Sequence, residues 1–158
     1  MRTTWKWLGE HVDLTGLTPE AVAKRITLGG LEVEGLHRLD AGLEKVVAAR
    51  ITAVAPHPGA DRLRVCTIDD GTGVARTVVC GAPNAAEGLT VPLALPGAVL
   101  PGGIRVETAE VRGVPSAGML CSARELGVSD DHGGLLIFDA GVAPGVPVAG
   151  LLGLDDVV

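Results

Sequence analysis

The first 44 residues combine apolar spacing typical of helices with one stretch of strict alternation. Residues 5–12 are expected to form a short helix or turn with one apolar side. Thr18 is placed as an N-cap with Pro19 at the first helical position, which predicts a helix to about residue 28. In residues 31–36 the apolar Leu31 and Val33 alternate with Glu32 and Glu34, the pattern of a half-buried strand. This part of the chain is therefore predicted to be a small α+β piece.

From residue 45 to residue 121 the pattern changes to short apolar runs separated by Gly and Pro turns. The turn Asp70-Gly71-Thr72-Gly73 predicts that the second and third runs form a hairpin. The predicted strands cover residues 46–55, 63–69, 74–80, 90–95 and 104–112. Five short strands with this many turns fit a small closed barrel better than a sandwich, so the fold is expected to be mainly β.

Residues 112–127 hold the densest local signals in the chain. Ser122 and Glu125 have the Ser-x-x-Glu spacing of a capping box, and Gly127 follows as a stop signal. The sequence therefore predicts one short, capped helical turn at residues 122–126 on a β framework. No nucleophile–base pair and no metal-ligand spacing accompanies this turn, which favours a binding surface over catalysis.

Composition narrows the setting of the protein without identifying its chemistry. The chain has 158 residues, enough for one domain or one domain with an appendage. No apolar run approaches the ~20 residues that span a bilayer, and the N-terminus lacks the apolar core of a signal peptide. A cytoplasmic protein without a membrane partner is expected. The three cysteines are far apart in the sequence, which favours buried reduced thiols over metal or redox use.

The charge distribution argues against a strong non-specific nucleic-acid binder, because the net charge is −6. Residues 45–140 are the least acidic part, and all of their cations except Lys45 are arginines, which suit bidentate phosphate contacts. Aromatic residues make up 2% of the chain, and none lies in the five predicted strands. Base stacking, worth ~1–3 kcal/mol per base, is therefore largely unavailable on the barrel. Any RNA contact should be weak and directed at the backbone or at structured ends.

Several segments resemble a known family. The tRNA-binding OB-fold domains are similar to residues 57–66, 78–84, 94–103 and 112–127. The Cys-Gly-Ala-Pro-Asn form at 80–84 and the Leu-Gly-Val-Ser-Asp-Asp-His form at 126–132 resemble the β-subunit family of bacterial phenylalanyl-tRNA synthetases in particular. The start of the chain, at residues 7–8 and 30–35, and its end, at 152–158, resemble the same family. The resemblance covers the whole chain in order.

The resemblance implies a five-stranded OB-fold barrel at residues 45–150, inserted after the first half of a split α+β domain at residues 1–44. Residues 151–158 would re-enter the split domain, whose second half would follow Val158. The parent enzyme would join phenylalanine to its tRNA with ATP and Mg²⁺, in partnership with a catalytic α subunit and the remaining β domains. This chain would then carry no catalytic residue and no cofactor of its own.

Residues 116–119 are the best binding candidate, because they offer a hydroxyl, an approachable backbone and a methionine that can lie against a base. The alternative is that Met119 belongs to the core and Gly118 marks a bulge. The arginines either form a phosphate track, which would include Arg76, or are solvated and paired with Glu side chains. The candidate RNA-binding residues are Arg62, Arg64, Asn84, Arg105, Arg112, Ser116, Gly118, Met119 and Arg124.

Three functions remain open from the sequence. The first is a non-catalytic part of the synthetase β subunit that contributes tRNA binding or subunit architecture. The second is a free-standing tRNA-binding or chaperone-like OB-fold protein, and the third is a purely structural module.

His57 is interpreted as a loop residue, and residues 130–132 as a solvated turn rather than a metal site. An apolar face of the N-terminal piece is expected to self-associate or to pack against residues 135–158; its members are Leu8, Val12, Val22, Ile26, Leu31 and Val33.

Overall fold

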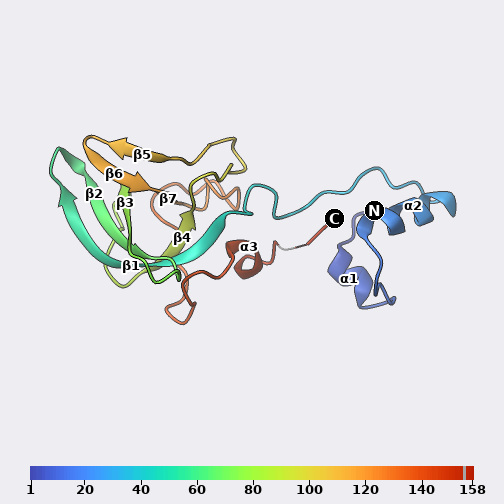
Figure 1. Ribbon diagram of the computed structural model, residues 1–158. Helices are drawn as coiled ribbons and strands as arrows, with labels where there is room; N and C mark the ends of the chain where they lie inside the picture. Colours follow the sequence, from blue (N-terminus) through green and yellow to red (C-terminus); the bar gives the residue numbers. More distant parts are fainter. Residues whose placement is uncertain (155) are drawn as a thin grey trace. The chain divides into compact units, whose positions relative to one another are not determined.

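The computed structural model describes residues 1–154 and 156–158 and divides them into two compact units. The N-terminal unit consists of residues 1–41 together with the described residues of 152–158. The barrel unit consists of residues 42–151 and contains all of the strands (Figure 1).

The N-terminal unit contains two helices, α1 (Trp5–Gly9) and α2 (Pro19–Leu28). Both begin at a threonine cap, since Thr4 Oγ1 accepts a hydrogen bond from the Trp7 amide at 3.2 Å and Thr18 Oγ1 accepts one from the Ala21 amide at 3.3 Å. Proline stands at the start of α2 and Gly29 is its C-cap. The predicted helix from Pro19 to about residue 28 is confirmed.

The strand predicted at residues 31–36 is wrong, because this segment has no regular secondary structure and no pairing strand. Its amides are tied back to α2 instead, with Leu31 donating to the Ile26 carbonyl and Val33 to Thr27 Oγ1. Backbone pairing begins only at His37, which exchanges bonds of 2.7 and 2.8 Å with Val158. Alternation sets the period of side chains, but a strand also needs a neighbouring chain, and residues 31–36 have none among the described residues.

The barrel unit is mainly β, as predicted. Five strands form one antiparallel sheet in the order β3-β2-β1-β4-β7, and β5 and β6 form a separate hairpin. The elements are β1 (Val46–His57), β2 (Ala60–Asp69), β3 (Arg76–Cys80), β4 (Thr90–Ala94), β5 (Thr108–Val111), β6 (Val114–Ala117), β7 (Met119–Leu120) and the short helix α3 (Val148–Leu151). The predicted strand 104–112 is divided, since Arg105 makes only an isolated bridge with Val99 and β5 begins at Thr108.

The core lies inside the curved sheet. The largest side chains that are fully buried there come from four different strands, and they include Ile51, Ile68, Val78 and Leu93. Each such side chain contributes about 1.5–3 kcal/mol through removal of its apolar surface from water. The core is therefore shared by β1, β2, β3 and β4.

Side chains, rather than a backbone ladder, connect the sheet to the β5–β6 hairpin. The Val79 amide on β3 donates to Ser116 Oγ on β6 at 3.0 Å, and Arg76 Nη1 donates to the Ala117 carbonyl at 3.1 Å. In Figure 1 β6 accordingly lies beside β3. Among the described residues, the ladder is therefore not continuous around the barrel.

Candidate nucleic-acid interface

The capped turn after β7 has the predicted bonds. The Ser122 amide and hydroxyl both donate to Glu125 Oε2, and the Glu125 amide lies 3.5 Å from Ser122 Oγ. The segment is a series of turns rather than a helix, closed by a 3.3 Å bond from the Leu126 amide to the Ser122 carbonyl. The capping box fixes the backbone of Arg124, whose amide also donates to the Asp131 carbonyl.

Ser116 and Gly118 belong to the framework. The Ser116 side chain is 5% exposed, and its hydroxyl donates to the Gly118 carbonyl while accepting from the Val79 amide. Gly118 has φ +136°, and a Cβ there would lie 2.8 Å from the Ala94 carbonyl oxygen. Both residues are buried and engaged within the fold, so direct RNA contact by either stays a prediction that would require these contacts to be broken. Met119, half-buried on β7, stays a prediction.

Asn84 is also occupied within the fold. Its Oδ1 accepts from the Leu135 amide at 2.8 Å, and its Nδ2 donates to the Leu135 carbonyl at 3.1 Å. The side-chain amide therefore bonds to the backbone of Leu135 as a residue of a neighbouring strand would. These two bonds fix the segment that contains the buried Leu135. Both the oxygen and the nitrogen of its amide thus have partners within the fold, and RNA contact by Asn84 stays a prediction.

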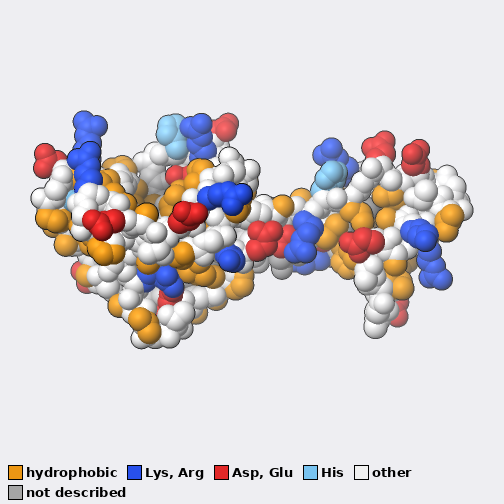
Figure 2. All heavy atoms as spheres, turned by 45° about the horizontal axis from the view of Figure 1, so that its top comes forward, with side chains coloured by type: hydrophobic (Ala, Val, Ile, Leu, Met, Phe, Trp, Pro, Cys, Tyr) orange, Lys and Arg blue, Asp and Glu red, His pale blue; other side chains and the backbone are white. Residues whose placement is uncertain are grey.

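The predicted arginines fall into two groups. Arg64 is engaged, because its Nη1 donates to the Ala85 carbonyl at 2.6 Å. The others are exposed and make no side-chain hydrogen bond or ion pair with the described part of the chain; they are Arg62, Arg105, Arg112 and Arg124. On the face shown in Figure 2, basic side chains stand among acidic and apolar ones. These four guanidinium groups, called the free arginines below, are the groups best able to meet phosphates.

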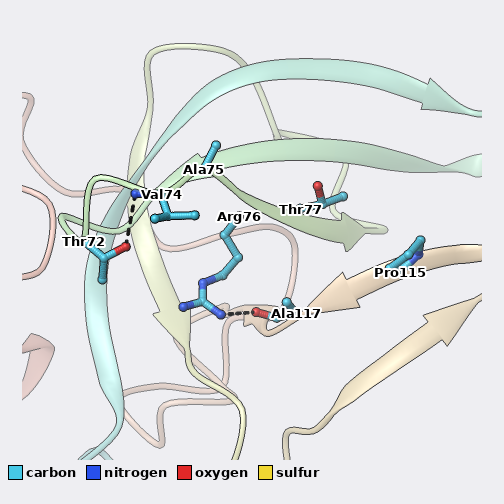
Figure 3. Close-up of a pocket in the computed structure, with 7 residues that line it drawn as sticks. All are labelled: Thr72, Val74, Ala75, Arg76, Thr77, Pro115 and Ala117. Atoms are coloured by element: carbon cyan, nitrogen blue, oxygen red, sulfur yellow. Dashed lines mark hydrogen bonds between the residues drawn. The ribbon is translucent and has the colours of Figure 1, made fainter.

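Arg76 is not a member of that set, because it crosses a hollow between β3 and β6 (Figure 3). The hollow has a volume of about 250 Å³. Arg76 Nη2 lies 2.8 Å from Oδ2 of Asp70, a buried carboxylate that also accepts from Thr72. Burial raises the pKa of Asp70, but hydrogen bonds from Thr72 and Arg76 outweigh it and hold the pKa below its usual value. Arg76 therefore stabilises the barrel and is unsuited to an RNA track.

A second hollow, of about 400 Å³, lies beside the capped turn. Its lining residues are Gly102, Ile104, Ser122, Arg124, Glu125 and His132. Residues 130–132 form an exposed turn as expected, in which Asp131 Oδ1 accepts from the Gly133 amide at 2.9 Å. Within the described residues, no three His, Cys, Asp or Glu side chains are grouped so as to hold a metal ion.

The three cysteines are free and buried, and the predicted burial is confirmed. Burial raises the pKa of Cys66 to about 11 and that of Cys121 to about 12, and it raises the pKa of Cys80. The thiolate is the reactive form, so these groups are poor nucleophiles at neutral pH.

The barrel unit matches a known family of protein domains. The model described as "Putative tRNA binding domain" matches residues 46–147, which run from the first residue of β1 to the residue before α3. The chain belongs to this tRNA-binding domain family.

Similarity to other proteins extends beyond the tRNA-binding domain to nearly the whole chain. The phenylalanine–tRNA ligase β subunit of Anaeromyxobacter dehalogenans is 53% identical over 158 residues, which is 100% of this chain and 20% of the relative. The β subunit of Bordetella parapertussis is 54% identical over 150 residues, 95% of this chain and 18% of the relative. The chain thus spans about one fifth of the length of these relatives.

Among solved structures, the C-terminal domain of Plasmodium vivax p43 superposes with a TM-score of 0.47 and 22% identity, over 63% of this chain and 56% of that one. No helix among the described residues is long and apolar enough to cross a membrane.

One residue of the tRNA-binding domain has a role that the sequence did not indicate. His57 is buried and uses both ring nitrogens, rather than standing free in a loop as predicted. Its position before Pro58-Gly59 was visible as a turn, but its partner Val111 is 54 residues away in the sequence. No local pattern could have paired them.

Proposed function

We propose that this chain is the N-terminal part of a phenylalanine–tRNA ligase β subunit, and that its barrel unit is an auxiliary tRNA-binding surface. One observation carries the proposal: similarity to β subunits runs through both units at about half identity, and the tRNA-binding family model coincides with the barrel. This continuity favours the β subunit over a free-standing tRNA-binding or chaperone-like protein, because the N-terminal unit is matched as well.

In this proposal the parent enzyme is cytoplasmic and joins phenylalanine to tRNA with ATP and Mg²⁺. Catalysis belongs to a partner α subunit, and the remaining β domains complete the assembly. The barrel, residues 45–150, is inserted into an α+β domain that begins with residues 1–44 and resumes at residues 151–158. The chain itself supplies positioning and RNA contact rather than chemistry.

The free arginines provide the proposed contacts. Each presents an exposed guanidinium with no competing partner among the described residues, so it can bind a phosphate without first breaking a bond of the fold. The net charge of −6 and the interspersed acids of Figure 2 oppose non-specific attraction. The proposal therefore calls for few contacts, modest affinity and strong dependence on salt.

A titration of the full chain with tRNA at increasing salt tests the proposal. Each free arginine that meets a phosphate should contribute about 0.7–0.9 to the slope of log K against log salt, and its replacement by Ala should remove that contribution. Lys24→Ala is the matched control, since it removes one exposed charge from α2 of the N-terminal unit. A wild type that does not bind at low salt would refute the proposal of RNA binding.

A purely structural role is the second candidate. It is supported by the acidic balance of the chain and by the absence of aromatic residues from all seven strands. In this case the barrel would hold the rest of the β subunit in place, and neither the wild-type chain nor the four Arg→Ala variants would bind tRNA at low salt.

We also propose that the N-terminal unit self-associates. Of the predicted apolar face, Val12, Ile26 and Leu31 are exposed in this unit. Sedimentation velocity of the full chain should show association that rises with concentration, and Ile26→Glu/Leu31→Glu should abolish it. A monomer at all concentrations would rule the idea out.

A further inference from the structure

Two hairpin tips of the barrel unit are joined by one buried side chain. His57, the last residue of β1, is 5% exposed, and its Nε2 lies 2.9 Å from the carbonyl oxygen of Val111, the last residue of β5. The tips of the β1–β2 and β5–β6 hairpins therefore lie side by side at the end of the barrel unit (Figure 1).

The second ring nitrogen fixes the tautomer of His57. The Gly59 amide donates to Nδ1 at 2.9 Å, so Nδ1 is an acceptor and the ring hydrogen is on Nε2. Nε2 then donates to the Val111 carbonyl. One neutral imidazole thus closes its own hairpin through Nδ1 and holds the neighbouring hairpin through Nε2.

The held hairpin ends in a strained arginine. Arg112 has φ +48° and is the one non-glycine residue with positive φ among those described. With Gly113 at φ +85° it forms the two-residue loop of the hairpin, in a position that favours Asn, Asp or Gly. A side chain kept in a disfavoured backbone conformation points to a function of that side chain.

The other tip also carries a free arginine. In the β1–β2 pairing Pro56 faces Arg64 and His57 faces Ala60, so residues 61–63 bulge out without partners on β1. Arg62 lies on this bulge and is exposed. Each of the two tips joined by His57 therefore presents one guanidinium group, and the exposed Asp61 precedes Arg62 in the sequence.

We propose that His57 is a positioning residue, which locks Arg62 and Arg112 into a single edge that grips the phosphodiester backbone of a structured RNA. This inference rests on the proposed function. A locked edge makes the two phosphate contacts cooperative, because binding by one arginine leaves the other already in place. Without the lock, the two tips would bind independently.

A double-mutant cycle on tRNA affinity tests this positioning role. In the wild-type background, Arg62→Ala and Arg112→Ala should each lower the affinity for tRNA. The double variant should bind about three- to tenfold more tightly than expected from multiplying the two single losses. His57→Asn keeps an oxygen near the Gly59 amide but does not reach Val111, so in that background the losses should multiply. His57→Gln can still reach the Val111 carbonyl and should retain the coupling.

Arg105→Ala is the matched control, since Arg105 is free but lies on neither tip. Its effect should multiply with that of either tip arginine in every background. Multiplicative losses in the wild type, or coupling that survives His57→Asn, would overturn the lock while leaving RNA binding intact. A wild type that does not bind tRNA at low salt would instead refute the proposed function itself.

Amide hydrogen exchange of β5 and β6 in His57→Asn should accelerate while that of β1–β4 does not, which separates loss of the lock from unfolding.

Discussion

The two units treat similar apolar side chains in opposite ways. In the N-terminal unit neither helix has a buried residue, and Leu28 and Leu31 are 78% and 73% exposed. In the barrel unit Leu93 and Ile51 are 0% exposed. The difference is one of neighbours rather than of composition, since a curved sheet encloses its own inner face whereas two short helices cannot.

Different forces therefore hold each unit. The barrel unit has a contiguous core, which is supplemented by polar bonds such as Asp70–Arg76. The N-terminal unit depends on threonine caps and on backbone pairing of His37 with Val158. Substitutions of the same chemical kind should then have unequal costs in the two units.

The largest difference is expected for leucine truncation. Leu93→Ala should destabilise the barrel unit by about 3 kcal/mol, because it removes buried apolar surface and leaves a cavity. Leu28→Ala, at an exposed position of α2, should change the stability of the N-terminal unit by less than about 0.5 kcal/mol.

Chemical denaturation followed by thiol labelling measures the first effect. Cys66, Cys80 and Cys121 are buried in the barrel unit, so their labelling reports its opening. Helix content measured by circular dichroism reports the second. Comparable losses from the two substitutions would contradict the contrast between the units.

A smaller difference is expected between two aspartates that both bind an arginine. Asp70 is buried, so Asp70→Asn should lower the free energy of unfolding by about 2 kcal/mol at neutral pH. This loss is smaller than that for breaking a fully buried ion pair, because Arg76 is partly exposed to solvent. Asp40 of the N-terminal unit binds Arg38, whose side chain is 68% exposed. Asp40→Asn should therefore cost less than about 0.5 kcal/mol.

The pH dependence has a definite sign. The pKa of Asp70 is lower in the folded protein than its usual value, so its stabilisation is present above the unfolded pKa, near 4, and is lost as pH falls through the folded pKa. Asp70→Asn should remove this component from the acid unfolding of the barrel unit. A variant with an unchanged acid-unfolding profile would show that the ion pair does not contribute.

The sequence predicted what short-range signals determine. The cap at Thr18, the capping box at Ser122 and Glu125, and the hairpin turn at residues 70–73 all depend on residues within a few positions of each other. Apolar runs likewise located β1 to β4, because their period is set by the strand itself.

Long-range contacts decided what the sequence did not predict. Ser116 looked like a free hydroxyl until β6 placed it against Val79, and Asn84 until it met Leu135. His57 was hidden in the same way, since Val111 is far along the chain. The free arginines are exposed, and their accessibility needed no long-range information, because exposure requires no specific partner.

The smallest expected difference concerns the two caps. Thr18→Ala removes one 3.3 Å bond at an exposed helix start, so it should cost about 0.5 kcal/mol. Ser122→Ala should cost about 1–2 kcal/mol, because Ser122 is buried and its loss leaves the Glu125 carboxylate with one donor fewer. Hydrogen exchange at the Ala21 and Glu125 amides measures both effects locally. Matched Thr18→Ser and Ser122→Thr variants should retain most of the protection, since each keeps the hydroxyl. Equal losses at the two caps would mean that burial does not strengthen this bond, and that the contrast between the units lies in their apolar cores alone.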